Sequence, residues 1–161
     1  MHDMLVRLYQ LPSLAEALEA TSRQGIAVRR ALAPERPVVM SWVASNFASS
    51  VAEVEIAYGR LPIACFIAVR DQRIAGFACY DATARNFFGP EAVVEEERGR
   101  GVGRTLLLAA LHAQREQGYA YAIIGGVGPA DFYARSVGAI PIAGSTPGIY
   151  AGMLRPKSAA N

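Results

Sequence analysis

The sequence has few cysteines, little net charge and no long apolar run, and each shortage removes a class of protein. Its two cysteines, Cys65 and Cys79, lie in apolar strand-like runs without the spacing of metal ligands. We therefore expect two buried thiols in a reducing compartment and no metal site, although a disulfide between adjacent strands stays open. A net charge of +2 is too small for a nucleic-acid surface.

Membrane and export signals are also missing from the sequence. No apolar run approaches the ~18 residues that a membrane span needs. The first ten residues, MHDMLVRLYQ, lack the cationic and apolar regions of a signal peptide. We expect a cytoplasmic protein without a membrane partner, built as a single domain over residues 1–161 with a frayed tail at 157–161.

What the chain does have is an apolar pattern that changes its period and so predicts both strands and helices. Strands are expected at 4–12, 26–32, 86–94, 119–126 and 148–154, and a hairpin at 63–83 around a turn at Asp71 and Gln72. Helices are expected after the capping pairs Ser13/Glu16 and Ser50/Glu53, after Pro34, over about 101–117, and from Pro129 to Gly138.

One stretch, EERGRGVGRTLLLAAL from residue 96, places arginines and three glycines before the longest apolar helix pattern. Glycine lets backbone approach a ligand closely, and a helix start offers free N–H groups and positive potential. These properties predict a phosphate site. A nucleotide-triphosphatase loop would need Lys before Ser or Thr, and a dinucleotide fingerprint would need glycine where Leu106 stands.

The segment from Arg98 to Gly103 matches the Arg/Gln-x-x-Gly-x-Gly/Ala signature of the GNAT superfamily of N-acetyltransferases, and the chain resembles that family over about residues 26–154. DFYARSVGAIPI, from residue 131, resembles the family's later helix with its Phe-Tyr pair. The resemblance implies an α/β (α+β) fold with a mixed, mostly antiparallel central sheet flanked by helices. Residues 4–25 would be an added strand and helix.

The resemblance also implies that the chain uses acetyl-CoA as a co-substrate. Backbone N–H groups from Arg98 to Gly103 would hold the diphosphate of coenzyme A, arginines would add charge, and strand backbone at Val93 and Val94 would bind the pantetheine arm. The cofactor-binding residues implied in this way are Val93, Val94, Arg98, Gly99, Arg100, Gly101, Val102, Gly103, Arg104 and Thr105. For Arg104 a solvated surface charge is the alternative.

Acetyl transfer to an amine needs a proton for the leaving thiolate, and Tyr133 of the Phe-Tyr pair is the implied donor, because a phenol keeps its proton at neutral pH. Its alternative role is aromatic packing. The sequence assigns no general base. Glu91, Tyr80 and Asp81 are candidates, whereas His112 is expected to be a surface or packing residue.

One position departs from the family pattern, because Gly126 stands where many members carry an asparagine that fixes the pantetheine. Either the glycine-rich turn brings backbone to the same place, or cofactor binding is weaker.

The expected function is therefore transfer of acetyl to a primary amine of a small molecule in a ternary complex. The alternative is a non-catalytic acyl-CoA binding or sensing module, and the donor's chain length stays open. The search region for the acceptor pocket comprises Trp42, Phe47, Tyr58 and Tyr150. A homodimer is a further expectation, with an edge strand near residues 138–154 as its support.

Overall fold

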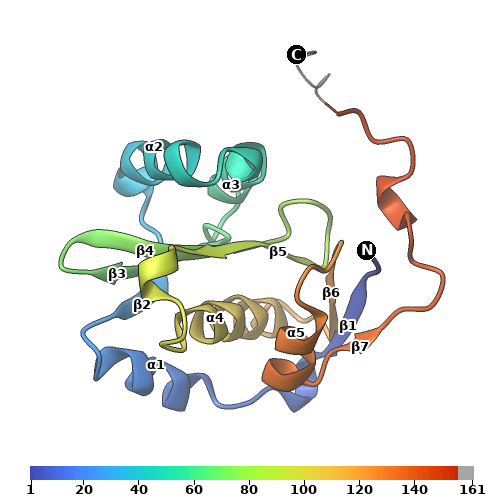
Figure 1. The fold of residues 1–161 in the computed structure, drawn as a ribbon, viewed down its shortest axis with the longest axis horizontal. Helices are drawn as coiled ribbons and strands as arrows, with labels where there is room; N and C mark the ends of the chain where they lie inside the picture. Colours follow the sequence, from blue (N-terminus) through green and yellow to red (C-terminus); the bar gives the residue numbers. More distant parts are fainter. Residues whose placement is uncertain (156–161) are drawn as a thin grey trace.

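The computed structural model describes residues 1–155, which form one seven-stranded sheet between two layers of helices (Figure 1). The strands are β1 (Met4–Arg7), β2 (Ala27–Arg30), β3 (Cys65–Arg70), β4 (Arg73–Tyr80), β5 (Phe87–Val93), β6 (Tyr121–Ile124) and β7 (Ile140–Pro141). The α-helices are α1 (Leu14–Ser22), α2 (Arg36–Asn46), α3 (Val51–Tyr58), α4 (Val102–Glu116) and α5 (Ala130–Val137). The tail expected at 157–161 lies outside the described residues.

The strand order is β2-β3-β4-β5-β6-β1-β7, and all neighbouring pairs are antiparallel except β5 and β6. This confirms the predicted mixed, mostly antiparallel fold. Parallel neighbours need a crossover connection, and α4 provides it between β5 and β6. Residues 94–101, which include the 3-10 helix Glu95–Glu97, lead from the end of β5 to the N-terminus of α4.

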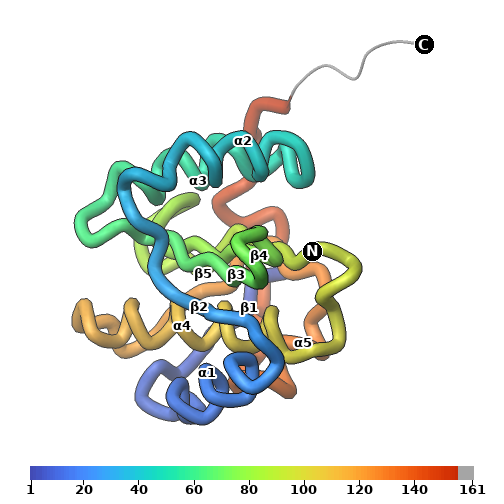
Figure 2. Tube along the Cα trace, turned by 90° about the vertical axis from the view of Figure 1, so that its left-hand side faces the viewer, coloured from blue at the N-terminus to red at the C-terminus, as the bar shows by residue number. Residues whose placement is uncertain are grey.

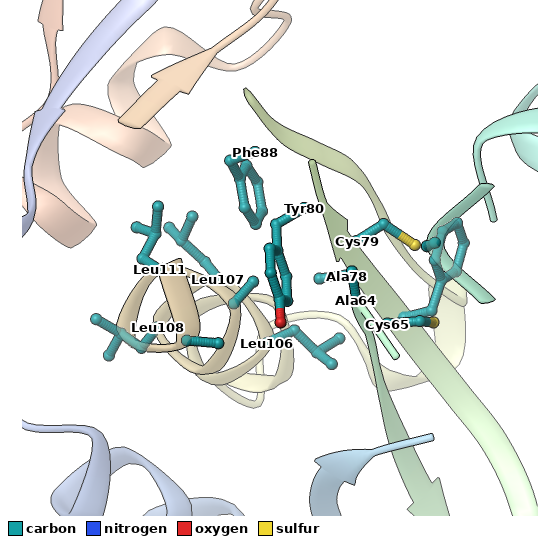
Figure 3. Packing of buried hydrophobic residues seen from close by; sticks show 14 of the residues in the cluster. Ala64, Cys65, Ala78, Cys79, Tyr80, Phe88, Leu106, Leu107, Leu108 and Leu111 are labelled. Atoms are coloured by element: carbon teal, nitrogen blue, oxygen red, sulfur yellow. The ribbon is translucent and has the colours of Figure 1, made fainter. Parts of the chain in front are cut away.

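Helices α2 and α3 cover one face of the sheet, and α1, α4 and α5 lie on the other (Figures 1 and 2). Helix α4 is the most enclosed, because apolar residues occupy its inner face almost without a break. Figure 3 shows leucines of α4 packed beneath Tyr80 and Phe88 of the sheet. The fully buried leucines of α4 are Leu106, Leu107, Leu108 and Leu111.

The N-terminal strand is an internal member of the sheet rather than an added edge. β1 lies between β6 and β7, with Val6 opposite Ala122 and fully buried. Helix α1 then packs on α4, where the buried Thr105 hydroxyl donates to the Ala17 carbonyl at 3.3 Å. Residues 4–25 thus support both the sheet and the helix that follows the glycine segment.

The strand predicted at 148–154 is wrong. Gly148–Tyr150 forms a short 3-10 helix, and Gly148 and Gly152 have positive φ values of 59° and 71°, which interrupt an extended chain. Strand β6 lies between β5 and β1, and β1 in turn pairs with β7. A strand at 148–154 would therefore find no free edge beside β6. The edge strand β7 has only two residues, and the homodimer stays a prediction.

The two predicted capping boxes have different outcomes. Ser13 caps α1, since its hydroxyl accepts the Glu16 N–H at 3.2 Å. Ser50 precedes α3 without a side-chain cap, so that prediction is wrong. The 3-10 helix Ala48–Ser50 runs directly into α3 and leaves Ser50 with helical φ and ψ, whereas a capping residue needs extended backbone.

The two cysteines are free, fully buried and directly opposite each other on β3 and β4. The pKa of the Cys79 thiol is raised well above its usual range, mainly by burial and to a lesser extent by the neighbouring Cys65. The prediction of two buried thiols is confirmed, and a thiol of this kind is a poor nucleophile at neutral pH.

Replacing Val6 by alanine tests whether β1 is part of the folded core. We expect Val6→Ala to lower the free energy of unfolding by about 2 kcal/mol, because it leaves a cavity at a fully buried site. The half-buried neighbour Arg7 provides the control, and Arg7→Ala should cost much less. Equal urea midpoints for wild type and Val6→Ala would contradict an internal β1.

Candidate active site

The sheet opens between its two parallel strands. β5 and β6 pair only at Phe87–Ile123 and Phe88–Ile124, after which β6 ends. β5 continues to Val93 along β4 alone, with Ala78 opposite Glu91 and Gly76 opposite Val93. The second edge of β5 beyond Phe88 therefore has no strand partner, and its backbone groups can bind a ligand.

Backbone geometry shows which valine faces this open edge. The Val94 N–H donates to the Ala75 carbonyl of β4 at 2.9 Å, so it points away from the opening. Alternation along an antiparallel pair turns the N–H and carbonyl of Val93 toward the opening. The Arg98 Nε donates to this Val93 carbonyl at 3.2 Å, which leaves the Val93 N–H as the group aimed at a ligand.

The glycine segment leads from this edge into α4 through two left-handed residues. Gly99 and Gly101 have φ values of 75° and 81°, a conformation that other residues rarely adopt. The Arg98 N–H is bonded to the Glu95 carbonyl, and the Thr105 N–H to Gly101. Within residues 1–155, no protein group accepts from the intervening N–H groups of residues 99–104.

The N–H groups of residues 99–104 lie at the start of a fifteen-residue helix, where they can bind an anion with the help of the positive end of the helix dipole. The side chains around these groups have unequal roles. Arg104 is exposed on the first turn of α4, whereas the Arg100 guanidinium lies 3.4 Å from Glu97. Val102 and the Thr105 hydroxyl are buried in the core and support the loop from below.

Tyr133 lies on α5 behind the opening. Its ring makes edge contacts with Phe132 and Phe88, at centroid distances of 5.1 and 6.3 Å. Burial first, and the charge of Glu91 second, raise the pKa of Tyr133. The phenol therefore keeps its proton at any physiological pH.

Glu91 lies on the same side of β5 as Tyr133 and the start of α4. Its Oε1 is enclosed and has no hydrogen-bond partner among the described residues. A side chain at position 103 would meet this oxygen at 3.4 Å and the Phe132 ring at 3.7 Å, so Gly103 permits the close approach. Burial raises the pKa of Glu91 well above its usual range.

The other base candidates are engaged elsewhere. The Tyr80 hydroxyl accepts a hydrogen bond from Arg30 Nη1 at 2.7 Å, and the residue is fully buried against the leucines of α4 (Figure 3). The Asp81 carboxylate accepts the Asn86 N–H at 2.7 Å and holds the turn before β5. His112 contacts the Pro12 carbonyl at 2.9 Å, as expected of a packing residue.

The comparisons with known proteins indicate the family. A model of the acetyltransferase (GNAT) domain matches residues 62–136, from the start of the β3–β4 hairpin region to α5. Residues 62–136, a little under half of the chain, are thus similar to a GNAT acetyltransferase domain. The match contains the open edge of β5, the glycine segment and Tyr133.

Solved structures share this GNAT fold at low sequence identity. The glucosamine N-acetyltransferase region of a fungal multi-domain GH3 β-N-acetylglucosaminidase aligns with a TM-score of 0.72 at 15% identity, over 88% of this chain and 19% of that one. A GCN5-related N-acetyltransferase from Sphaerobacter thermophilus gives 0.66 at 19% identity, over 88% and 48%. One from Kribbella flavida gives 0.52 at 16%, over 87% and 53%. This chain thus spans about half of these proteins or less, and no curated protein matches it.

GNAT proteins use acetyl-CoA as co-substrate, and the residues present fit that molecule. A diphosphate offers more oxygens than one side chain can satisfy, and the N–H groups of residues 99–104 are free to bind them. The Val93 N–H faces the path from that loop into the opening. No group of metal-binding side chains occurs within residues 1–155, and no helix there is long and apolar enough to cross a membrane.

At the position of the frequent GNAT asparagine, the Gly126 N–H donates to the buried Asp3 carboxylate at 2.9 Å. This backbone group is therefore engaged by the N-terminal segment and does not replace the asparagine side chain. The Tyr150 ring lies over the same turn, because a side chain at Gly125 would meet its hydroxyl at 2.3 Å. The turn needs glycine for that contact.

The four residues predicted to line the acceptor pocket do not lie together. Trp42 and Phe47 pack with Phe77 of β4 as one aromatic cluster, with centroid distances of 5.5 to 6.2 Å. The enclosed Tyr58 hydroxyl has no protein partner among the described residues, and burial raises its pKa. Tyr150, in the 3-10 helix Gly148–Tyr150, packs against the turn after β6. Its pKa is raised mainly by burial, and further by the charges of Asp3 and Glu53.

Sequence reasoning missed the side chains that brace the loop from distant elements. Gln24, after α1, donates from Nε2 to the Arg100 carbonyl at 2.9 Å. Arg70, at the end of β3, lies 3.1 Å from Glu97. A cavity of about 580 Å³ adjoins this pair and is lined by the β3–β4 turn and the 3-10 helix Glu95–Glu97. No local pattern links residues so far apart in the chain.

Replacing Glu91 by glutamine tests its environment through the pH dependence of stability. Folded Glu91 binds its proton more tightly than an unfolded glutamate, whose pKa is about 4.3. Its contribution to the free energy of unfolding is therefore complete below pH 4.3 and is lost as the pH rises toward the raised pKa. Glu91→Gln should be more stable than wild type at pH 8 and similar at pH 4.

Urea denaturation at the two pH values measures this difference. Glu95→Gln, which changes an exposed carboxyl in the same segment, is the control and should show no such pH dependence. A Glu91→Gln variant less stable than wild type at pH 8 would mean that the carboxylate is stabilised where it lies.

Proposed function

We propose that this chain transfers acetyl from acetyl-CoA to a primary amine of a small molecule, by direct attack in a ternary complex. The observation that carries the proposal is the convergence of three features at one opening of the sheet. These are the N–H groups of residues 99–104, the edge of β5 at Val93 that no strand pairs within residues 1–155, and the enclosed side chains of Glu91 beside Gly103 and of Tyr133 beside Phe88.

The glycine loop and Val93 would bind and orient the co-substrate. The loop N–H groups would hold the diphosphate, with Arg104 adding charge from the first turn of α4. The Val93 N–H would position the arm that carries the thioester. Acetyl-CoA supplies the activated acetyl group, and the protein supplies position and protons.

Glu91 is proposed as the general base. An attacking amine must be neutral and loses one proton as its nitrogen forms the new C–N bond. Burial makes the Glu91 carboxylate more basic than an exposed one. Its Oε1 is enclosed beside Gly103, and among the described residues no protein donor competes for that oxygen.

Tyr133 is proposed as the general acid. As the C–S bond breaks, the phenol would donate its proton to the departing thiolate sulfur. The proton held by Glu91 would then restore Tyr133 through solvent, so each turnover leaves the protein unchanged. The two free cysteines are fully buried on β3 and β4, which disfavours an acyl-enzyme on either thiol.

The aromatic cluster of Trp42, Phe47 and Phe77 lies on the sheet face covered by α2 and α3, opposite the face of Glu91 and the start of α4. Tyr150, whose ring lies over the turn after β6, is therefore proposed as the part of the predicted region that meets the acceptor. A small amine suits it better than a nucleic acid, since the net charge is only +2.

One observation favours the alternative of a non-catalytic acyl-CoA binding module. The Gly126 N–H, which could have replaced the missing asparagine, is bonded to Asp3. Such a module would bind acetyl-CoA without transferring acetyl to any amine.

Replacing Tyr133 by phenylalanine distinguishes the two functions. Release of free thiol is measured with acetyl-CoA and a panel of small primary amines, and acetyl-CoA affinity is measured by calorimetry. We expect Tyr133→Phe to lower kcat about 100-fold or more, with an affinity within about twofold of wild type, because only the proton donor is removed.

Tyr121→Phe removes an exposed hydroxyl on β6 and should leave kcat unchanged. Wild type that binds acetyl-CoA but releases no thiol with any amine would favour the binding module. Wild type that does not bind acetyl-CoA would contradict both functions.

A further inference from the structure

The carboxylate of Glu97 lies between two arginines at the entrance to the glycine loop. Its Oε1 is 3.1 Å from Arg70 Nε, and its Oε2 is 3.4 Å from Arg100 Nε. The Glu97 side chain is only 15% exposed, against 46% for Arg100. A mostly enclosed anion therefore lies three residues before an arginine of an anion-binding loop.

The two arginines differ in their freedom to move. Arg70 ends β3 and is 27% exposed. Its Nε and Nη2 atoms are enclosed and make no hydrogen bond among the described residues, although Nε lies 3.1 Å from Glu97 Oε1. The Arg100 backbone is fixed, because its carbonyl accepts from Gln24, but its side chain is half exposed. Arg100 can therefore turn its guanidinium without moving the loop, whereas Arg70 stays with Glu97.

A carboxylate and a phosphate offer a guanidinium the same kind of acceptor. With the diphosphate held by the N–H groups of residues 99–104, the Arg100 side chain would have two anionic partners. Glu97 would also repel the diphosphate, to the extent that Arg70 leaves its charge uncompensated.

We propose that Glu97 is a built-in competitor of the coenzyme A diphosphate for Arg100, and that Arg70 is the positioning residue that compensates Glu97 when Arg100 turns to the phosphates. The inference rests on the proposed function, since it assigns the anion at the loop to coenzyme A. The affinity for coenzyme A would then depend on the ion pairs of Glu97 with Arg70 and Arg100, which do not include Glu91 or Tyr133.

Calorimetric titration with coenzyme A tests the proposal on five proteins: wild type, Glu97→Gln, Arg70→Gln, the double variant, and Glu96→Gln as control. Glu96→Gln removes an exposed carboxyl beside Glu97 and changes the net charge by the same amount as Glu97→Gln. We expect Glu97→Gln to bind coenzyme A about threefold to tenfold more tightly, because Arg100 is released from one partly buried ion pair.

Arg70→Gln should bind more weakly than wild type, because uncompensated Glu97 then holds Arg100 more firmly and repels the diphosphate. The double variant should regain the affinity of Glu97→Gln. A merely structural role predicts the opposite, since loss of either partner would loosen the loop and the double variant would bind no better than Arg70→Gln.

Thermal unfolding provides a second readout on the same proteins. Glu97→Gln should have a lower Tm than wild type together with its higher affinity, because it loses an ion-pair partner of Arg70. Glu97→Gln with the affinity of Glu96→Gln would overturn the inference while leaving the proposed function intact. Wild type without affinity for coenzyme A would overturn both.

Discussion

The constraint behind this site is a set of backbone polar groups that the protein leaves without partners. β5 and β6 separate after two residue pairs, and beside the separated edge the N–H groups of residues 99–104 have no acceptor within residues 1–155. Most of these loop residues are exposed, so a bound anion could take the place of water on their N–H groups. The glycines at 99 and 101 allow the chain to hold those groups on one concave surface.

The remainder of the fold keeps this opening in place. The β5–α4–β6 crossover separates the strands while the apolar face of α4 keeps the helix against the sheet. The N-terminal segment contacts both the glycine loop with α4 and the turn after β6. Gln24 and Thr105 join α1 to the loop and to α4, and Asp3 holds the turn after β6. Residues before position 26 thus fix the geometry of a site that lies mostly after position 87.

The sequence predicted most of the fold and the central motif for local reasons. Gly99, Gly101 and the apolar face of α4 lie within one short stretch, so spacing alone predicted the helix and indicated an anion site at its start. The hairpin at Asp71 and Gln72 was equally local, and both residues have the positive φ values of a tight turn. The Phe-Tyr pair before Gly138 indicated α5 through its resemblance to a family motif.

The failures came from interactions between distant segments. Nothing near residues 148–154 shows that β1 already occupies the position beside β6, so an apolar pattern there predicted a strand that does not form. The engagement of Gly126 by Asp3 and of Arg100 by Glu97 depends on chain folding over many residues or on side-chain direction. The sequence offered Glu91, Tyr80 and Asp81 alike as candidate bases, and only the folded chain shows that Glu91 lies beside Gly103 whereas Tyr80 and Asp81 are engaged elsewhere.

The most direct test of the central claim is an amide NMR titration of the chain with coenzyme A. The account predicts the largest shift changes at the N–H groups of residues 99–104 and at Val93, with little change at Val94, whose N–H is bonded to Ala75. Binding that left the amides of Gly99, Gly101 and Gly103 unchanged would show that the diphosphate lies elsewhere and would contradict the account.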